Sequence, residues 1–153
     1  MCIRDSAYTD AYTKGDIKWI DQTFNRALKL WLLSVCGGIV MLFGCQYFYH
    51  IWIGNKVLVP FTVSLSTFIY VSFFNLNNCV TYLINGLNKI RIQIITSLVI
   101  TATYVLTIMS MGKQLGIEGI VLCMAASYAV MSLIHLYQCK LLIKGKATGI
   151  WNK

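Results

Sequence analysis

Residues 92–112 read IQIITSLVITATYVLTIMSMG, a run of 21 residues without a charged side chain. An apolar helix of about 20 residues crosses a bilayer core of roughly 30 Å. Four stretches share this property and are long enough for a crossing: Leu30–Asn55, Val57–Asn88, Ile92–Gly112 and Gly119–Cys139. The fold class predicted from this pattern is all-α, a polytopic membrane bundle with four transmembrane helices between residues 30 and 143.

The composition favours a lipid environment for this chain. Hydrophobic residues make up 58% of the 153 residues and charged residues only 12%, about half the share that is usual in soluble domains. A soluble protein this apolar could not cover its surface with polar groups. Four spans use nearly all of the chain, so no separate soluble domain is expected.

The placement of the net charge of +8 indicates a membrane orientation and argues against nucleic acid as a partner. Five Lys and Arg residues precede the first run and four follow the last, while the three connections hold one, two and one. Alternate segments therefore hold eleven and two basic residues, which is the positive-inside pattern. This pattern predicts a multi-pass membrane protein with both termini in the cytoplasm.

Residues 1–29 are predicted to form a cytoplasmic loop followed by an amphipathic helix. Ala7–Gly15 is polar and is expected to be a loop, and Asp16 can cap a helix that begins at Ile17. Apolar residues recur at helical spacing as far as Trp31, so this helix is expected to lie at the membrane interface and to run into the first span. Its role is either a lipid-surface anchor or a hinge between two halves of a transporter.

The two ends of the chain carry separate signals. Met1–Ser6 resembles a translated sequencing adapter, so we expect it to be non-native and the natural protein to extend further upstream. Residues 144–153 form a basic tail that would favour anionic lipid headgroups on the cytoplasmic side.

Polar side chains form a stripe in the second half of the second run. They recur at intervals of three or four residues, which places them on one face of a helix: Ser72, Asn75, Asn78, Tyr82 and Asn85. Amides at membrane depth are unfavourable against lipid, so this face must meet other helices or a watery cavity. The stripe therefore either lines a hydrophilic substrate path or makes interhelical hydrogen bonds worth about 1 kcal/mol each.

The sequence lacks the side-chain sets of a catalytic or metal site. It has no glycine-rich phosphate loop, no Ser/His/Asp set and no paired carboxylates, and no acidic residue lies within a span. We therefore expect neither an enzyme nor a bound metal or cofactor. The hydroxyl of Thr96 is expected to bond to its own helix. His135 and Gln138 lie one turn apart near the cytoplasmic end of the last span. They are expected to snorkel to the headgroups, and the alternative is a role in binding a ligand.

Five segments resemble the C-terminal part of bacterial oligosaccharide-lipid flippases, which transport polysaccharide or O-antigen units and share a superfamily with the multidrug (MATE) exporters. In order along the chain these segments are 7–20 (AYTDAYTKGDIKWI), 52–54 (WIG), 85–93 (NGLNKIRIQ), 115–119 (LGIEG) and 145–153 (GKATGIWNK). Their order and spacing relative to the spans carry the resemblance, which covers essentially all of residues 7–153.

The resemblance implies a MATE-like, two-lobed fold of roughly 12 to 14 helices around a hydrophilic cavity, working by alternating access. This chain would supply about the last four helices. The whole protein would flip an undecaprenyl-pyrophosphate-linked oligosaccharide across the inner membrane for polysaccharide or lipopolysaccharide O-antigen biosynthesis. Its partners would be the lipid bilayer, the lipid-linked oligosaccharide and the N-terminal helices of the parent transporter.

The sequence leaves open the roles of two basic residues and two alternative functions of the chain. Lys89 and Arg91, in the predicted cytoplasmic turn, either contact a diphosphate or headgroup or serve only as orientation charges. The chain could instead be a fragment of a MATE-type drug or cation exporter, which would carry an acidic residue in its other half. It could also be a small four-helix membrane scaffold, complete as written.

The predicted orientation can be tested with single-cysteine reporters. A cysteine at position 55 should react with a membrane-impermeant thiol reagent added outside the cell, because it lies in an outer connection, whereas a cysteine at position 146 should not. The reverse labelling would contradict the topology.

Overall fold

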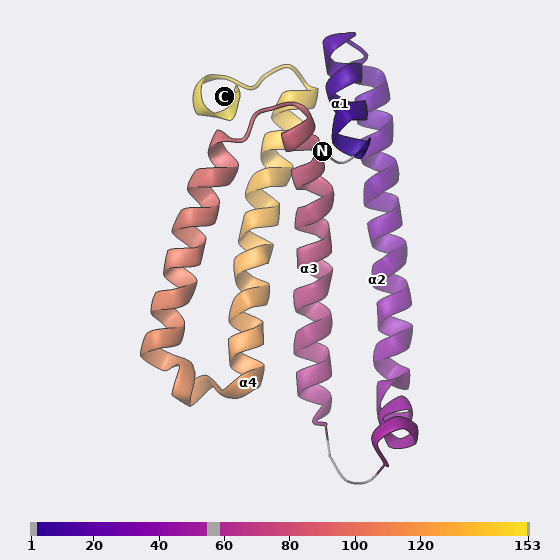
Figure 1. Cartoon of the computed structure of the whole chain (residues 1–153), viewed down its shortest axis with the longest axis vertical. Coiled ribbons are helices and arrows are strands. Elements are labelled where there is room, and N and C mark those ends of the chain that lie inside the picture. The colour runs from indigo at the N-terminus through magenta and orange to yellow at the C-terminus, as the bar shows by residue number, and fades with distance from the viewer. Residues whose placement is uncertain (1–2, 55–58, 153) are drawn as a thin grey trace.

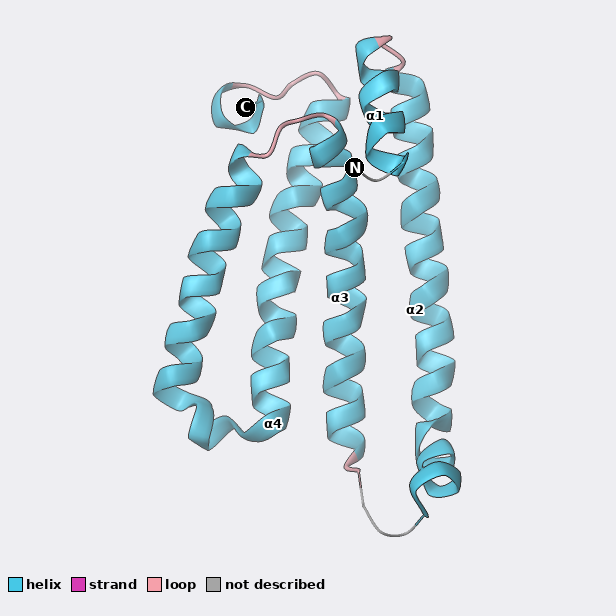
Figure 2. Ribbon diagram, viewed as in Figure 1, coloured by secondary structure: helices cyan, strands magenta, loops and turns pink. Residues whose placement is uncertain are grey.

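Every element of regular structure in the described part of the chain is helical, as the sequence predicts. The computed structural model describes residues 3–54 and 59–152. Its elements are α1 (Ile3–Thr13), α2 (Ile17–Ile53), α3 (Phe61–Gly86), α4 (Arg91–Ile143) and the short 3-10 helix η2 (Gly149–Asn152). Figure 2 shows how short the loops between the helices are. The end of the first run at Asn55 and the start of the second run at Val57 lie outside the described residues.

Four long rods make up the bundle: α2, α3 and two antiparallel arms of α4 (Figure 1). Helix α1, the turn between α3 and α4, and the C-terminal segment all lie at one end. Together with the first turns of α2 and the last turn of α4, these segments hold most of the basic residues, whereas Lys113 is three residues from the turn at Gly116, at the opposite end. The two ends of the bundle therefore differ in charge as the alternation in the sequence requires.

Helix α2 begins where the sequence predicts and continues without a break into the first apolar run. The Asp16 carboxylate accepts a hydrogen bond from the Trp19 amide at 3.0 Å, which caps the first turn. Gly15, with φ of +72°, separates this helix from α1. Ile20 and Phe24 on the apolar face of α2 are buried by the protein itself.

The expected loop at Ala7–Gly15 is wrong, because residues up to Thr13 belong to α1. Tyr8 and Ala11, three residues apart on one helical face, are both buried in the core. The Thr9 hydroxyl donates to the Gly86 carbonyl at 2.7 Å and so ties α1 to the end of α3. Two buried side chains in a polar segment give too little periodicity to reveal this helix in the sequence.

The third and fourth apolar runs are the two arms of α4, joined at a single residue. Gly116 has φ of +62° and ψ of −176°, whereas helical structure is assigned on both sides of it. The chain reverses direction here (Figure 1). From the sequence, Gly112–Gly119 is expected to be a short outer loop in which Gly116 and Gly119 permit the turn. In the structure the non-helical backbone is confined to Gly116, so this loop is shorter than expected.

The bundle is packed tightly at one end and exposes apolar side chains elsewhere. Its core joins α1, α2, α3 and the end of α4, with Ile20, Leu83, Ile84 and Cys139 fully enclosed. Large apolar side chains stand exposed along α2 and the first arm of α4, among them Val40, Met41, Phe43, Leu106 and Met109, at 67–80%. None of the residues in the most apolar part of α2 is buried, which is not how the core helix of a soluble protein behaves.

By length and composition, two of the described helices are apolar enough to cross a membrane: α2 over Ile17–Trp52, and α4. The 53 residues of α4 contain two of the four predicted spans. Helix α3, which holds the second predicted span, is not among the helices that meet this test. Its amide and hydroxyl side chains lower its hydropathy.

Replacing Gly116 with alanine should destabilise the bundle. A backbone conformation with positive φ and ψ near 180° is almost exclusive to glycine, and strain of this kind costs about 1–3 kcal/mol. Gly37→Ala is the control, because a methyl group there meets nothing within 4 Å and the helix gains about 0.5–1 kcal/mol. Unfolding by denaturing detergent measures both effects, and equal stabilities for the two variants would contradict the turn.

Candidate functional site

A cavity of about 550 Å³ lies among α1, α2 and α3, and three of the five stripe residues line it. These are Asn75, Asn78 and Tyr82, which follow one another along the face of α3 that looks toward α2. The structure therefore places the middle of the stripe at a cavity between helices.

Helix α2 supplies most of the opposite wall, with hydroxyl and aromatic groups and one guanidinium. The lining residues from α1 and α2 are Tyr8, Thr23, Arg26, Ala27, Leu30, Trp31 and Ser34. Arg26 is the one charged residue among the described residues of the lining. The cavity thus offers hydrogen-bond donors and acceptors together with the positive charge of Arg26, whose side chain is exposed, a composition suited to binding a polar or anionic ligand.

The two ends of the predicted stripe lie outside this cavity. The Ser72 hydroxyl donates to the Phe68 carbonyl at 2.8 Å, and its own carbonyl accepts from the Trp31 indole N–H at 2.8 Å. Asn85 is exposed near the end of α3, where its carbonyl accepts from the Asn88 amide. The stripe therefore divides into a cavity-lining middle and two ends with other contacts.

Lys89 and Arg91 are not among the residues that line the cavity. The Lys89 ammonium donates to the Asn152 carbonyl at 3.0 Å and so contacts the C-terminal segment. Arg91 is exposed at the first turn of α4. Arg26, which the sequence pattern placed only on the polar face of the amphipathic helix, holds the position facing the amides instead.

A buried histidine joins three rods of the bundle and was missed at the sequence level. His135, 0% exposed, lies on the second arm of α4. Its Nδ1 is 3.0 Å from Oδ1 of Asn77 on α3, and its Nε2 is 3.0 Å from Oγ1 of Thr96 on the first arm. The expectation that His135 and Gln138 snorkel to lipid headgroups is wrong, because both side chains are fully buried in the bundle.

The two contacts of the imidazole are mutually compatible. With the proton on Nδ1, the ring donates to Asn77 and can accept from the Thr96 hydroxyl. The same hydroxyl lies 2.8 Å from the Ile92 carbonyl, its expected partner on its own helix, and because it has one proton it donates either to this carbonyl or to the histidine. This network explains how three polar side chains are accommodated in a largely apolar interior.

Gln138 fastens the C-terminal segment to the same end of the bundle. Its amide nitrogen donates to the Lys89 carbonyl at 2.9 Å and lies 3.5 Å from the Trp151 carbonyl. The Trp151 ring meets that of Tyr137 edge to face, with centroids 5.3 Å apart. The tail is thus held partly by its own contacts, whatever its affinity for lipid.

One signal in the sequence could have revealed this packing. Buried positions recur along the second arm at intervals of three, four or seven residues, which keep them on one helical face: Ala125, Ser132, His135, Cys139 and Leu142. A histidine on the same face as small and apolar residues is more typical of an interior position than of a headgroup contact. Among the described residues, His, Cys, Asp and Glu do not gather in a group that could hold a metal ion.

Comparisons with protein-family models, with curated proteins and with solved structures find no match for this chain. Its function is therefore inferred from its residues and their geometry.

Two asparagines on α3 allow a matched test of the histidine network. Asn77→Leu should lower the free energy of unfolding by about 1–3 kcal/mol, because it leaves a buried imidazole N–H without its acceptor. Asn75→Leu, two residues away and exposed to the cavity, should change it by less than about 0.5 kcal/mol. Denaturing-detergent titration of both variants measures the difference, and a larger loss for Asn75→Leu would contradict the assignment.

Proposed function

We propose that this chain is the C-terminal part of a membrane transporter that flips an undecaprenyl-pyrophosphate-linked oligosaccharide from the cytoplasmic to the periplasmic leaflet. The observation that carries the proposal is the cavity in which Asn75, Asn78 and Tyr82 face Arg26 across α2 and α3. The resemblance of five ordered segments to oligosaccharide-lipid flippases supplies the substrate class.

A four-span placement in the bilayer supports this proposal. The exposed apolar surfaces of α2 and α4 suit hydrocarbon, and α3 lies between them with its polar groups turned toward its neighbours. The basic end, which carries α1 and the C-terminal segment, would face the cytoplasm of a bacterial cell by the positive-inside rule.

The chemistry of the cavity suits a ligand with many hydroxyl groups and an anionic group. Carboxamides both donate and accept hydrogen bonds, so they can pair with sugar hydroxyls in several orientations. The guanidinium of Arg26 presents a planar set of donors that matches phosphate oxygens. Weak contacts spread over many groups also allow release on the far side, which a transporter requires.

A drug or cation exporter receives less support from these residues. Such a protein would normally hold its cation with a buried carboxylate. After Asp21, the only acidic residue in the sequence is Glu118. It lies just beyond the turn at Gly116, and its carboxylate accepts a hydrogen bond from the Thr62 hydroxyl, away from the polar cavity.

The proposal can be tested in the full-length parent transporter, expressed in a strain that lacks it. Asn75→Leu combined with Asn78→Leu should strongly reduce the export of surface polysaccharide while leaving the protein level in the membrane fraction unchanged. The loss is expected because both amides would be removed from the substrate path. Arg26→Gln should reduce export as well.

Asn85→Leu provides the matched control, since it removes an amide of the same stripe that does not line the cavity. The Asn85→Leu variant should export as much surface polysaccharide as the unmodified parent transporter. Full export by the Asn75/Asn78 double variant would refute the substrate path and leave those amides as packing groups.

A further inference from the structure

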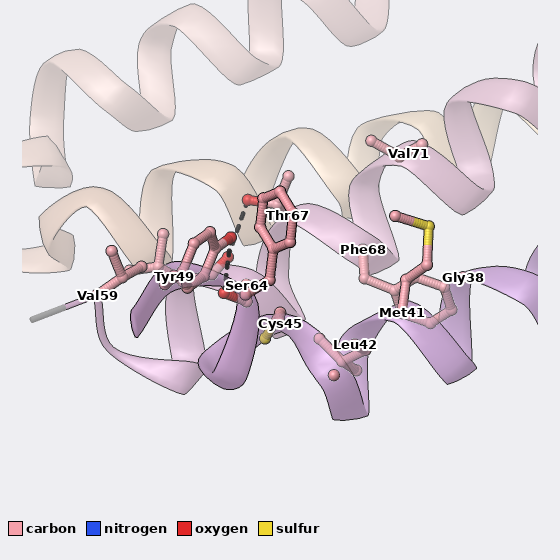
Figure 3. Close-up of a pocket in the computed structure, with 13 residues that line it drawn as sticks. Gly38, Met41, Leu42, Cys45, Tyr49, Val59, Ser64, Thr67, Phe68 and Val71 are labelled. Carbon is pink, nitrogen blue, oxygen red and sulfur yellow. Dashed lines mark hydrogen bonds between the residues drawn. The ribbon is translucent and has the colours of Figure 1, made fainter. Parts of the chain in front are cut away.

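A second cavity, of about 620 Å³, lies between α2 and α3 further from the basic end. Its walls are almost wholly apolar, with Met41, Leu42, Phe68 and Val71 among the side chains shown in Figure 3. The polar groups of Ser64 and Tyr49 contact each other at 3.5 Å rather than standing alone. This cavity therefore offers apolar surface to a ligand and little else.

The two cavities lie end to end along the same faces of α2 and α3. On α2 the lining residues recur every three or four positions, at 23, 27, 30 and 34 in the polar cavity and at 38, 41, 45 and 48 in the apolar one. The lining of α3 likewise continues from 64, 68 and 71 to 75, 78 and 82. The helices thus border one long cleft that is polar and cationic at one end and apolar along the rest.

Direct contacts between the helices narrow this cleft where its two halves meet. The Trp31 indole bonds to the Ser72 carbonyl, and Gly38 lies so close to the Phe68 ring that a methyl group there would stand 2.6 Å from it. A helix with side chains is about 10–12 Å across and does not fit between walls that touch. A single hydrocarbon chain is thinner and can lie along the open side of these contacts.

We propose that this cleft binds one anionic glycerophospholipid of the bilayer, with its phosphate at Arg26 and one acyl chain running toward Met41. The charge of Arg26 complements the phosphate, and the neighbouring amides and hydroxyls can accept bonds from or donate bonds to the rest of the headgroup. The inference rests on the bilayer placement proposed above but not on transport.

The dimensions of the helix agree with this occupant. Half of a hydrocarbon core of about 30 Å corresponds to roughly ten helical residues at 1.5 Å each. Ten residues beyond Trp31 is Met41, which lies in the apolar cavity. An acyl chain of one leaflet would therefore cross the narrow point and fill the near part of the apolar half.

Quenching of Trp31 fluorescence by brominated lipids tests the proposal. The purified chain, with Trp19, Trp52 and Trp151 changed to phenylalanine, is reconstituted into phosphatidylcholine vesicles. Two samples are then compared that contain the same mole fraction of brominated lipid. The brominated lipid is phosphatidylglycerol in one sample and phosphatidylcholine in the other, with bromine near the upper part of its acyl chains. We expect brominated phosphatidylglycerol to quench Trp31 at least about twofold more strongly, because the cleft selects the anionic lipid.

Arg26→Gln should abolish this selectivity, and Arg26→Lys should retain part of it. Lys29→Gln is the matched control, since it removes an exposed charge from the same helix outside the cleft and should leave the selectivity intact. Circular dichroism of each variant verifies that the helices are retained.

Three outcomes would overturn the proposal. Equal quenching by the two lipids would show that the cleft does not select an anion. If Lys29→Gln lowered the lipid selectivity as much as Arg26→Gln does, the selectivity would reflect general surface charge rather than binding at Arg26. Suppression of the selectivity by millimolar glycerol 3-phosphate in water would indicate a site for a soluble phosphate rather than a lipid. All three leave the export test of the cavity amides unaffected, so failure of this inference and failure of the proposed function are distinguishable.

Discussion

The hydrogen-bonded ring of His135 is the contact on which the arrangement of α3 and the two arms of α4 depends. Each of its nitrogens meets a side chain from a different rod, Asn77 on one side and Thr96 on the other. Apolar side chains can slide past one another at little cost, but a polar group inside an apolar bundle must keep its partner. A rotation or shift of any of the three rods would separate these groups, so the network fixes the register of the whole unit.

Helix α2 is attached in a different way, and the cleft is the consequence. Along most of its length it touches α3 only at contacts such as the Trp31 indole bond and the Gly38–Phe68 approach. Its firm attachment is at the basic end, where Ile20 and Phe24 enter the common core. A rod held at one end and loosely contacted along its length can move relative to its neighbours more easily than α3 can move relative to α4. Alternating access requires such a difference between rigid and movable parts.

The sequence predicted the features that depend on local chemistry. Asp16 caps α2 and Gly116 reverses α4 because a side-chain acceptor and a glycine conformation act within a few residues. The helical state of α1 and the interior position of His135 were not predicted. Both depend on partners distant in the chain, the Gly86 carbonyl in one case and Asn77 in the other, and a single sequence does not say which residues meet. For the cavity, the sequence pattern singled out the amides of α3 but left open whether they line a path or pack against other helices, and it gave no sign that Arg26 would lie beside them.

The three asparagines of α3 show why its role differs from that of the other rods. Each residue turns the helix by about 100°, so Asn75 and Asn78 lie about 60° apart, whereas Asn77 lies about 160° from Asn75 and about 100° from Asn78. The first two face α2 across the cavity, and the third faces α4. A helix with amides on two of its sides is best placed between neighbours that cover them. The position of α3 between α2 and α4 therefore accommodates its amides, and these amides explain why α3 lacks a stretch as apolar as those in α2 and α4.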